Sequence, residues 1–310
     1  MGEVQTANSM AASDFEILDE RFRRCVKLSA RVEKLFEGCR WAEGPVYFAA
    51  HRYLAWSDIP NDRLLRWDET DGRVSVLRSP AGYTNGNTLD REGRLVSCEQ
   101  GTRRVTRTEP DGSIAVVADR FEGKRFNSPN DVVVRSDGST WFTDPSYGID
   151  SDYEGYKAEP ELDGCHVYRV DGASGKITRV ADDFERPNGL AFSLDERKLY
   201  ISDTGSSRRH MRVFDVGEHG TLSNGKLFAP CTVGGFDGFR LDDGGRIWSS
   251  AGDGVHCLDP DGTLIGKVRV PEQVANVCFG GPKRNRLFIC ATTSLYSVLL
   301  PVNGARRGRN

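Results

Sequence analysis

The sequence lacks a long apolar run. No segment of the 310 residues approaches the roughly 18 consecutive apolar residues that a transmembrane helix needs. The first 20 residues are polar and acidic, without the apolar stretch after a basic start that marks a secretory signal. We therefore expect a soluble, cytoplasmic protein that has no membrane partner.

An excess of positive charge is also missing. The chain has 42 Lys and Arg against 45 Asp and Glu, for a net charge of −3, and the two signs are interspersed. A nucleic-acid-binding domain normally carries a basic excess on one face or in one tail. We expect no nucleic-acid partner.

Several motifs of metal and nucleotide chemistry are absent. The eight cysteines include no Cys-x-x-Cys pair and most lie among strand-forming residues, so we expect buried free thiols rather than a zinc site or a disulfide framework. The five histidines do not pair at metal-ligand spacing. No nucleophile elbow, phosphate-binding glycine loop or dinucleotide fingerprint stands in its required context, which excludes serine-hydrolase, kinase and Rossmann functions.

Helical periodicity is missing after Cys25, whereas glycine is abundant, at 34 residues of 310. The glycines fall in Asp-Gly and Gly-Gly pairs, such as Asp71-Gly72 and Asp111-Gly112, between apolar runs of four to seven residues. This pattern is typical of strands joined by tight hairpins. It predicts an all-β chain.

The pattern repeats six times, and each unit begins with a polar residue on a short turn before an apolar strand. The leading residues are Glu43, Asn87, Asn130, Asn188, Asp237 and Asn276. Their spacings of 39 to 58 residues suit propeller blades, which take about 40–45 residues each. We predict a six-bladed β-propeller with four-stranded blades.

The last unit ends after its third strand, near Pro301. The segment from Cys25 to Phe36 has the character to supply the missing outer strand, so we predict that an N-terminal strand closes the last blade and removes the open edges of the ring. The predicted organisation is a flexible leader over 1–22, the propeller over 23–301 and a C-terminal tail over 302–310.

The leading residues predict a metal site, because the innermost strands of a propeller line one central channel. They comprise two carboxylates and four carboxamides, with no Lys or Arg. Buried carboxylates that face each other need a cation, and oxygen ligands select hard divalent ions. Calcium suits such an irregular cage better than magnesium. The alternative is that pairs such as Asn188-Gly and Asp237-Gly only form turns.

Several motifs resemble the gluconolactonase family, also called the senescence-marker-protein and luciferin-regenerating-enzyme family. They include Trp41-Ala-Glu-Gly-Pro, Asn127-Ser-Pro-Asn-Asp, Arg186-Pro-Asn-Gly-Leu-Ala-Phe-Ser and Phe236-Asp-Gly-Phe, and the resemblance runs from about Phe22 to Val298. It implies a six-bladed propeller with one divalent cation in the channel, usually calcium, with magnesium, manganese and zinc as alternatives. The ligands that it implies are Glu43, Asn130, Asn188 and Asp237.

The resemblance also implies an enzyme of carbohydrate metabolism, a calcium-dependent lactonase that hydrolyses a small sugar lactone to the open aldonic acid. The cation would polarise the lactone carbonyl, and Asp237 would be the catalytic base that deprotonates the attacking water. Two alternatives stay open: a phosphotriesterase or other-lactone hydrolase on the same metal site, and a non-catalytic binding scaffold with structural calcium. We expect a monomer or small homo-oligomer.

Further residues are candidates for contact with the substrate. They are Asn87, Glu99, Arg125, Asn127, Tyr147 and Asn276. For Arg125 and Asn127 the alternative is a solvated loop. Tyr147 belongs to an insertion from Pro145 to Gly164, which we interpret as a lid over the channel mouth, with a surface excursion as the alternative.

Overall fold

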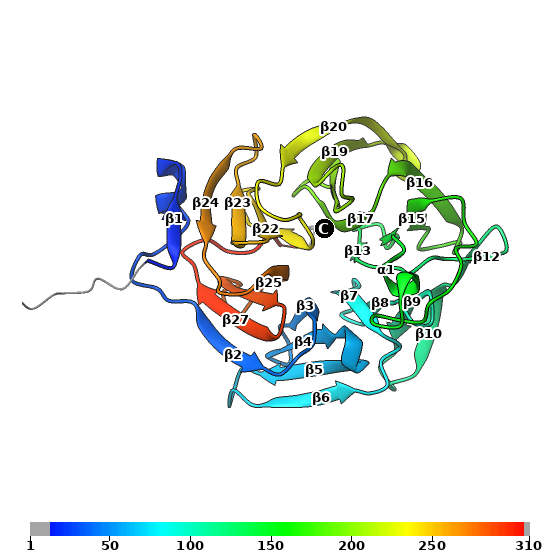
Figure 1. Cartoon of the computed structure of the whole chain (residues 1–310), viewed down its shortest axis with the longest axis horizontal. Helices are drawn as coiled ribbons and strands as arrows, with labels where there is room; N and C mark the ends of the chain where they lie inside the picture. Colours follow the sequence, from blue (N-terminus) through cyan, green and yellow to red (C-terminus); the bar gives the residue numbers. More distant parts are fainter. Residues whose placement is uncertain (1–12, 307–310) are drawn as a thin grey trace, which may run out of the picture.

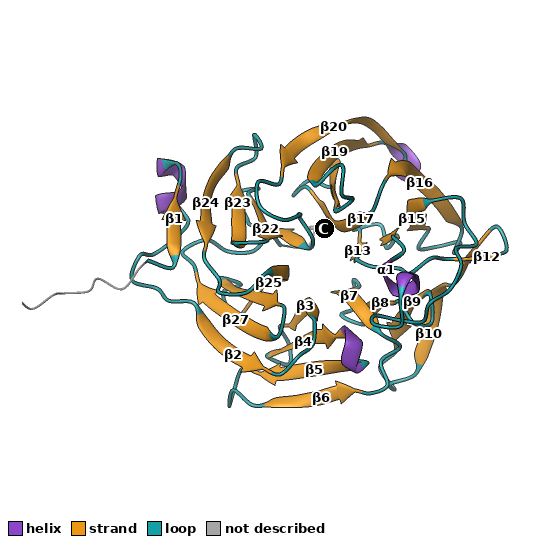
Figure 2. Cartoon of the chain, viewed as in Figure 1, coloured by secondary structure: helices purple, strands orange, loops and turns teal. Residues whose placement is uncertain are grey.

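The computed structural model describes residues 13–306, which form a ring of six antiparallel sheets around a central axis, as Figure 1 and Figure 2 show. This confirms the predicted six-bladed propeller. The innermost strands are β3 (Ala42–Phe48), β7 (Thr84–Leu89), β13 (Val132–Val134), β17 (Pro187–Phe192), β21 (Phe239–Leu241) and β25 (Val274–Gly280).

The other strands follow outward from the axis in each blade. Blade one adds β4 (Tyr53–Asp58), β5 (Arg63–Asp68) and β6 (Val74–Arg78); blade two adds β8 (Leu95–Glu99), β9 (Arg104–Thr108) and β10 (Ile114–Ala118). Blade three adds β14 (Thr140–Asp144), β15 (Cys165–Val170) and β16 (Ile177–Phe184); blade four adds β18 (Lys198–Asp203), β19 (His210–Val216) and β20 (Leu222–Pro230). Blade five adds β22 (Ile247–Ala251), β23 (Gly254–Leu258) and β24 (Leu264–Val268), and blade six adds β26 (Arg286–Ala291) and β27 (Ser294–Leu299).

Helices are few and short in the part of the chain that the structure describes. They are α1 (Tyr147–Asp150) and the 3-10 helices Glu20–Arg24, Ile59–Asn61 and Glu218–Gly220. A two-stranded ribbon, β11 (Arg120–Phe121) with β12 (Lys124–Arg125), projects between blades two and three. Within residues 13–306, no helix is long and apolar enough to cross a membrane.

The N-terminal segment closes the ring and also thickens it. Strand β2 (Glu33–Glu37) pairs with β27 and completes blade six, as predicted. Strand β1 (Phe15–Ile17) pairs with β24 and gives blade five a fifth strand. The predicted flexible leader is therefore wrong over its described residues after Asp14, which form a strand and a helix; residues 1–12 lie outside the described part.

The described residues of the predicted C-terminal tail contact blade five. Val302 is buried, Gly304 forms a β-bridge with Asp242, and the Ala305 amide donates to the Leu241 carbonyl. Residues 302–305 thus pack on blade five because their backbone groups find partners there. Residues 307–310 lie outside the described part.

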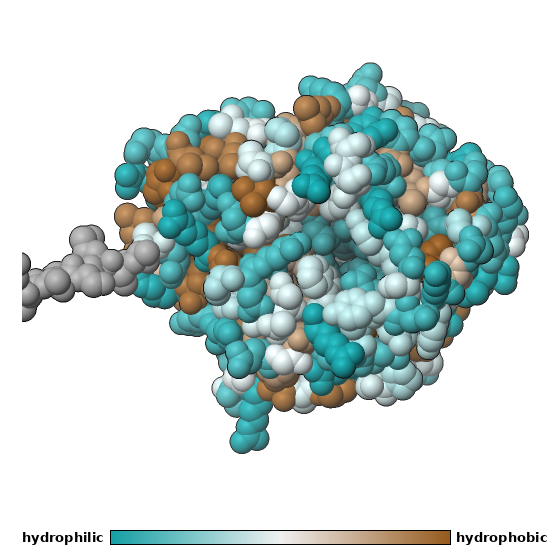
Figure 3. Space-filling model, in the orientation of Figure 1, coloured by the Kyte–Doolittle hydropathy of each residue, from teal (hydrophilic) through white to brown (hydrophobic). Residues whose placement is uncertain are grey.

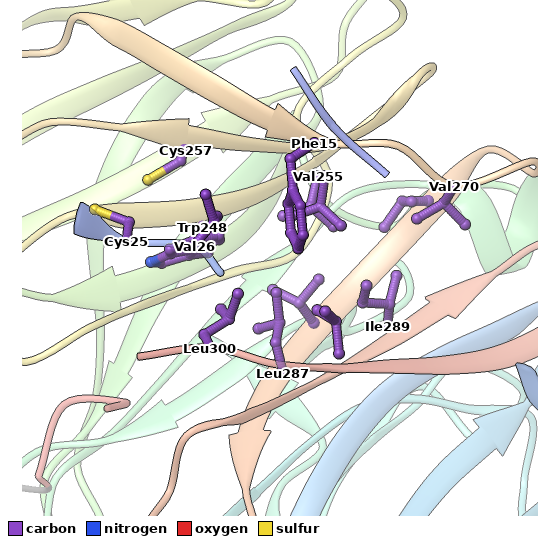
Figure 4. Close-up of a cluster of buried hydrophobic side chains, with 14 of the residues drawn as sticks. Phe15, Cys25, Val26, Trp248, Val255, Cys257, Val270, Leu287, Ile289 and Leu300 are labelled. Carbon is purple, nitrogen blue, oxygen red and sulfur yellow. The ribbon is translucent and has the colours of Figure 1, made fainter. Parts of the chain in front are cut away.

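Six apolar clusters hold the blades together, one at each junction between neighbours. Figure 4 shows the cluster between blades five and six, where Phe15 and Cys25 from the N-terminal segment join Trp248, Leu287 and Ile289. Because each sheet buries apolar side chains against both neighbours, the blades stabilise one another only as a ring.

We expect Phe22→Ala to destabilise the fold by about 3 kcal/mol, since truncation of a buried aromatic leaves a cavity. The Phe22 ring is fully buried, lies 5.9 Å from the Trp248 ring and covers Gly266 of β24. Urea unfolding would measure the loss. The matched control is Leu18→Ala, at a side chain that is 48% exposed; equal effects for the two variants would contradict the packing of this segment.

Candidate functional site

The innermost strands are irregular where they begin, and this irregularity aims polar side chains at the axis. The pairing of β3 with β4 shifts register between Glu43 and Val46, and β17 with β18 between Pro187 and Leu190. Asn130 and Asp237 each stand two residues before the first residue of β13 and β21. Bulges and strand starts of this kind re-aim side chains out of the sheet.

Two glycines allow the inner strands to approach closely. A Cβ atom on Gly189 would lie 2.2 Å from the Asp237 carbonyl oxygen, and one on Gly238 would lie 2.0 Å from the Asn276 side chain. Neither glycine has a positive φ. The Asn188-Gly and Asp237-Gly pairs are therefore not hairpin turns but contact points between consecutive blades.

Hydroxyl groups at the ends of the second strands fasten each blade to the next. The hydroxyls of Ser57, Thr143 and Ser202 donate to the carbonyl oxygens of Asn85, Asn188 and Asp237, at 2.6, 2.7 and 3.0 Å. Sequence analysis missed these residues, although the recurring Ser-Asp or Thr-Asp at the end of the second strand marks them. They fix the backbone from which the axial side chains project.

A polar cavity of about 340 Å³ lies at the axis, where the inner strands begin. Its lining residues are Trp41, Glu43, Asn85, Asn130, Tyr147, Glu154, Asn188, Thr204, Arg209, Gly234, Gly235, Asp237 and Gln273. In Figure 3 a hollow bordered mainly by hydrophilic residues opens near the centre of the ring. The four residues that the family resemblance implies as metal ligands all line this cavity.

Glu43 and Asp237 share the cavity with Arg209, but among the described residues neither carboxylate forms an ion pair with a Lys or Arg side chain. Burial raises the pKa of Glu43 to about 8, although hydrogen bonds from Asn276 and the Gly44 amide oppose the shift. Burial and then the charge of Glu43 raise the pKa of Asp237 well above its ordinary value. Asp131 contributes further repulsion to both. The arrangement favours the entry of a cation, which would relieve this repulsion.

The donor set fits a hard divalent ion. The Asn130 carboxamide makes no hydrogen bond within residues 13–306. The Asn188 carboxamide makes a long hydrogen bond, of 3.4 Å, to Thr204 and also interacts with the Asp237 carboxylate. Together with the carboxylates of Glu43 and Asp237, they offer oxygen ligands alone, as calcium and magnesium prefer. The described residues hold no cluster of three or more His, Cys, Asp or Glu side chains suited to a metal ion, so a site here depends on the carboxamides.

Asn87 and Asn276 are displaced from the predicted ring. In blade one, Ala42 pairs with the last residue of β4, and Glu43 follows it. In blade two, Thr84 pairs with the last residue of β8, so the residue equivalent to Glu43 is Asn85 and not Asn87. The Asn87 amide instead donates to Gly44 O, Ser57 Oγ and Asn85 O, at 2.9 to 3.0 Å. Its predicted contact with substrate is not supported in this cavity, because its carboxamide is occupied.

Asn276 supports the site from behind. Its Nδ2 donates to Glu43 Oε2 at 2.9 Å and its Oδ1 accepts from the Val277 amide at 2.8 Å. In blade six the counterpart of Glu43 is Ala275, because Val274 pairs with the last residue of β26. Asn276 is thus a residue that orients Glu43 and does not line the cavity.

Glu99, Arg125 and Asn127 also lie outside the cavity lining. Glu99 is buried and pairs with Arg104 at 2.7 Å. Arg125 donates from its guanidinium to the Thr102 carbonyl at 3.3 Å, and Asn127 donates to the carbonyl oxygens of Asp144 and Gly164. The structure therefore does not support their predicted roles in binding substrate, since each holds a loop in place.

Tyr147 lines the cavity, and its contact with substrate stays a prediction. Its hydroxyl lies 2.6 Å from Thr204 Oγ1, and the Arg186 guanidinium stacks 4.8 Å from its ring centre. The same insertion contributes Glu154, whose pKa burial raises to about 7. The insertion over 145–164 thus forms part of the cavity wall; whether it opens as a lid stays a prediction.

Other cavity residues were missed by sequence reasoning. They are Trp41, Asn85, Glu154, Thr204, Arg209 and Gln273. Trp41 stands in the motif that also contains Glu43, so it could have been predicted from the sequence. Arg209 and Gln273 lie in loops between strands, where no repeat marks them.

Comparison with known proteins agrees with the resemblance. Residues 41–293 match the family model described as the SMP-30/Gluconolactonase/LRE-like region. The chain is 30% identical over 302 residues to a gluconolactonase of Zymomonas mobilis, covering 90% of this chain and 83% of that protein. It is 32% identical over 262 residues to a pentonolactonase of Haloferax volcanii, covering 81% of each. The solved structure of a gluconolactonase from Xanthomonas campestris is similar, with a TM-score of 0.88, 40% identity and coverage of 93% of this chain and 94% of that chain.

We expect Asp144→Asn to change how stability depends on pH. Asp144 is fully buried, its Oδ1 has no hydrogen-bond partner, and burial raises its pKa to about 7. A raised pKa in the folded state favours the protein at low pH, and up to about 4 kcal/mol of that contribution is lost as pH rises from 4 to above 7.

The melting temperature of Asp144→Asn relative to the parent protein should therefore increase between pH 5 and pH 8. Melting curves across that range would measure the difference. A difference that stays constant over the range would show that Asp144 is already ionised in the folded protein at pH 5.

Proposed function

The chain belongs to the SMP-30/gluconolactonase/LRE-like family, and on that premise we propose that it hydrolyses a small sugar lactone to the open aldonic acid. The names of its relatives, a gluconolactonase and a pentonolactonase, support a lactone substrate of five or six carbons. The single observation that carries the proposal is the axial cavity, where two carboxylates and two carboxamides converge from four blades.

We propose a divalent cation, calcium in the first place, held by Glu43, Asn130, Asn188 and Asp237. When bound, such an ion would polarise the lactone carbonyl and stabilise the oxyanion that forms on attack. Calcium suits the set because its coordination tolerates neutral carboxamides and irregular geometry.

The protein's own groups would orient the reaction. Asp237 is partly exposed to the cavity and would accept the proton of the attacking water, as a general base does. Glu43 is fixed by Asn276 and cannot turn away from the axis. Tyr147, Arg209 and Gln273 line the walls and offer donors for the sugar hydroxyls.

Two asparagine variants, Asn130→Ala and Asn87→Ala, test the cation site. We expect millimolar calcium to raise the melting temperature of the parent protein, because a ligand that binds only the folded state stabilises it. Asn130→Ala should lose most of this increase. Asn87→Ala should melt at a lower temperature, since it removes three donated hydrogen bonds, but should keep the increase. Equal increases in both variants would contradict the assignment of Asn130.

The catalytic role of Asp237 gives a second test. We expect Asp237→Asn to fold normally and to lose about 100-fold or more in kcat on gluconolactone, the range for removal of a general base. The control is Asp261→Asn, in an exposed hairpin of the same blade, which should keep full activity. Near-normal turnover in Asp237→Asn would end the assignment.

A substrate panel separates the proposed function from its alternatives. Lactones and a phosphotriester would be assayed with and without a chelator. Loss of lactone hydrolysis on chelation supports the lactonase; turnover of the phosphotriester alone favours the other hydrolase. A chelator that lowers the melting temperature of a protein inactive on both substrates favours a scaffold with structural calcium.

A further inference from the structure

A second cavity, which we call the far pocket, lies at the opposite end of the channel. Its volume is about 410 Å³. The inner strands run from the polar cavity, at their starts, to the far pocket, at their ends. Their contributions include Val46, Leu89, Val134, Phe192, Leu241 and Phe279. Residues 304–306 of the C-terminal segment complete the lining.

The far pocket combines an apolar wall with positive charge. Ala191, Phe192, Leu194 and Phe279 are among its apolar residues. Its charged residues are Arg91, Arg240, Arg284, Arg306 and a single acid, Glu196. Such a combination differs from the polar cavity at the other end, where carboxylates outnumber arginine.

Glu196 and Arg240 are already engaged. The Glu196 carboxylate accepts from the Ser136 amide at 3.0 Å and lies 3.6 Å from Arg135 Nε. Arg240 donates to the Phe239 carbonyl at 2.7 Å and lies 3.5 Å from Asp131. Glu196 therefore does not neutralise the other arginines of the pocket. Arg240 does not offer a free guanidinium group to a ligand.

Arg284 and Arg306 are the available cations. Both line the far pocket, and among residues 13–306 neither forms an ion pair with a carboxylate. Burial and the positive charge of Arg306 lower the pKa of Arg284, although Asp243 opposes the shift. Two guanidinium groups that repel each other beside an apolar wall form a site that an anion would stabilise.

We propose that the far pocket binds an amphipathic carboxylate, with its hydrocarbon part on the apolar wall and its carboxylate on Arg284 and Arg306. The volume is that of a small-molecule site. The aldonic acid product is a poor occupant, because its hydroxyls would be buried against apolar side chains without partners.

Three probes separate the parts of this proposal: octanoate, octan-1-ol and acetate. Binding would be followed by calorimetry and by melting temperature. We expect octanoate to bind saturably and about tenfold or more tightly than octan-1-ol, because a charge-assisted contact is added to the same chain, and acetate not to bind measurably. Equal affinity for octanoate and octan-1-ol, or no saturable binding of octanoate, would overturn the proposal.

The double variant Arg284→Gln with Arg306→Gln should lose about tenfold in affinity for octanoate while octan-1-ol binding is unchanged. Arg73→Gln, at an arginine that is 86% exposed, is the matched control and should bind both probes as the parent does. A double variant with unchanged octanoate affinity would overturn the assignment of the two arginines. Because octan-1-ol binding reports the pocket wall, it also shows that the variant is folded.

The same experiment distinguishes the far pocket from the proposed cation site. Octanoate binding should persist in the presence of a chelator, because none of the four proposed metal ligands lines the far pocket. Binding that disappears on chelation would place the carboxylate on the cation at the other end of the channel and would overturn the proposal. Failure of octanoate to bind would leave the lactonase assays unaffected, so the two proposals fail separately.

Discussion

The pairing of β2 with β27 is the constraint on which the rest of the structure depends, because it turns a row of six sheets into a closed ring. Glu33 pairs with Ser297 across nearly the whole chain. Without β2, blade six would expose an unpaired edge, and Leu35 and Phe36 would leave the cluster between blades six and one. Only in the closed ring do side chains from blades one, three, four and five face the same axis.

Closure also has an electrostatic cost, since it brings Glu43 and Asp237 together in a partly desolvated cavity. Apolar packing at six junctions around the axis offsets that cost. Within residues 13–306 no Lys or Arg forms an ion pair with either carboxylate, and Asn276 and the Gly44 amide hold Glu43 in place instead. The divalent cation that we propose would therefore meet a Glu43 carboxylate whose position these hydrogen bonds already fix.

The blades could be predicted because short apolar runs and glycine turns repeat with the length of a propeller blade. The same repeat predicts six polar leading residues at the axis, and the family resemblance selects from them the four that line the cavity. Blade two shows where this reasoning ends. Asn85 and Asn87 are two residues apart and would share a face in a regular strand, so only the irregularity in β7 decides which of them reaches the cavity.

Other parts depend on contacts that no local pattern reveals. The carboxylate of Glu99 resembles a site residue in the sequence, but Arg104 and Thr106 hold it away from the cavity. The leader was expected to be free because it is polar, yet two aromatic side chains, Phe15 and Phe22, bury themselves against blade five. Two buried aromatic side chains therefore outweigh the polar composition of the segment.

The two ends of the channel differ because polar residues such as Glu43 and Asp237 stand at or just before the starts of the inner strands, whereas apolar ones such as Leu89, Phe192 and Leu241 stand at their ends. The floor between them contains Asn87, whose amide and carbonyl are both satisfied, and Arg240, which reaches Asp131. The same six strands can thus carry two chemically distinct cavities, since the polarity of a strand changes along its length while its fold does not.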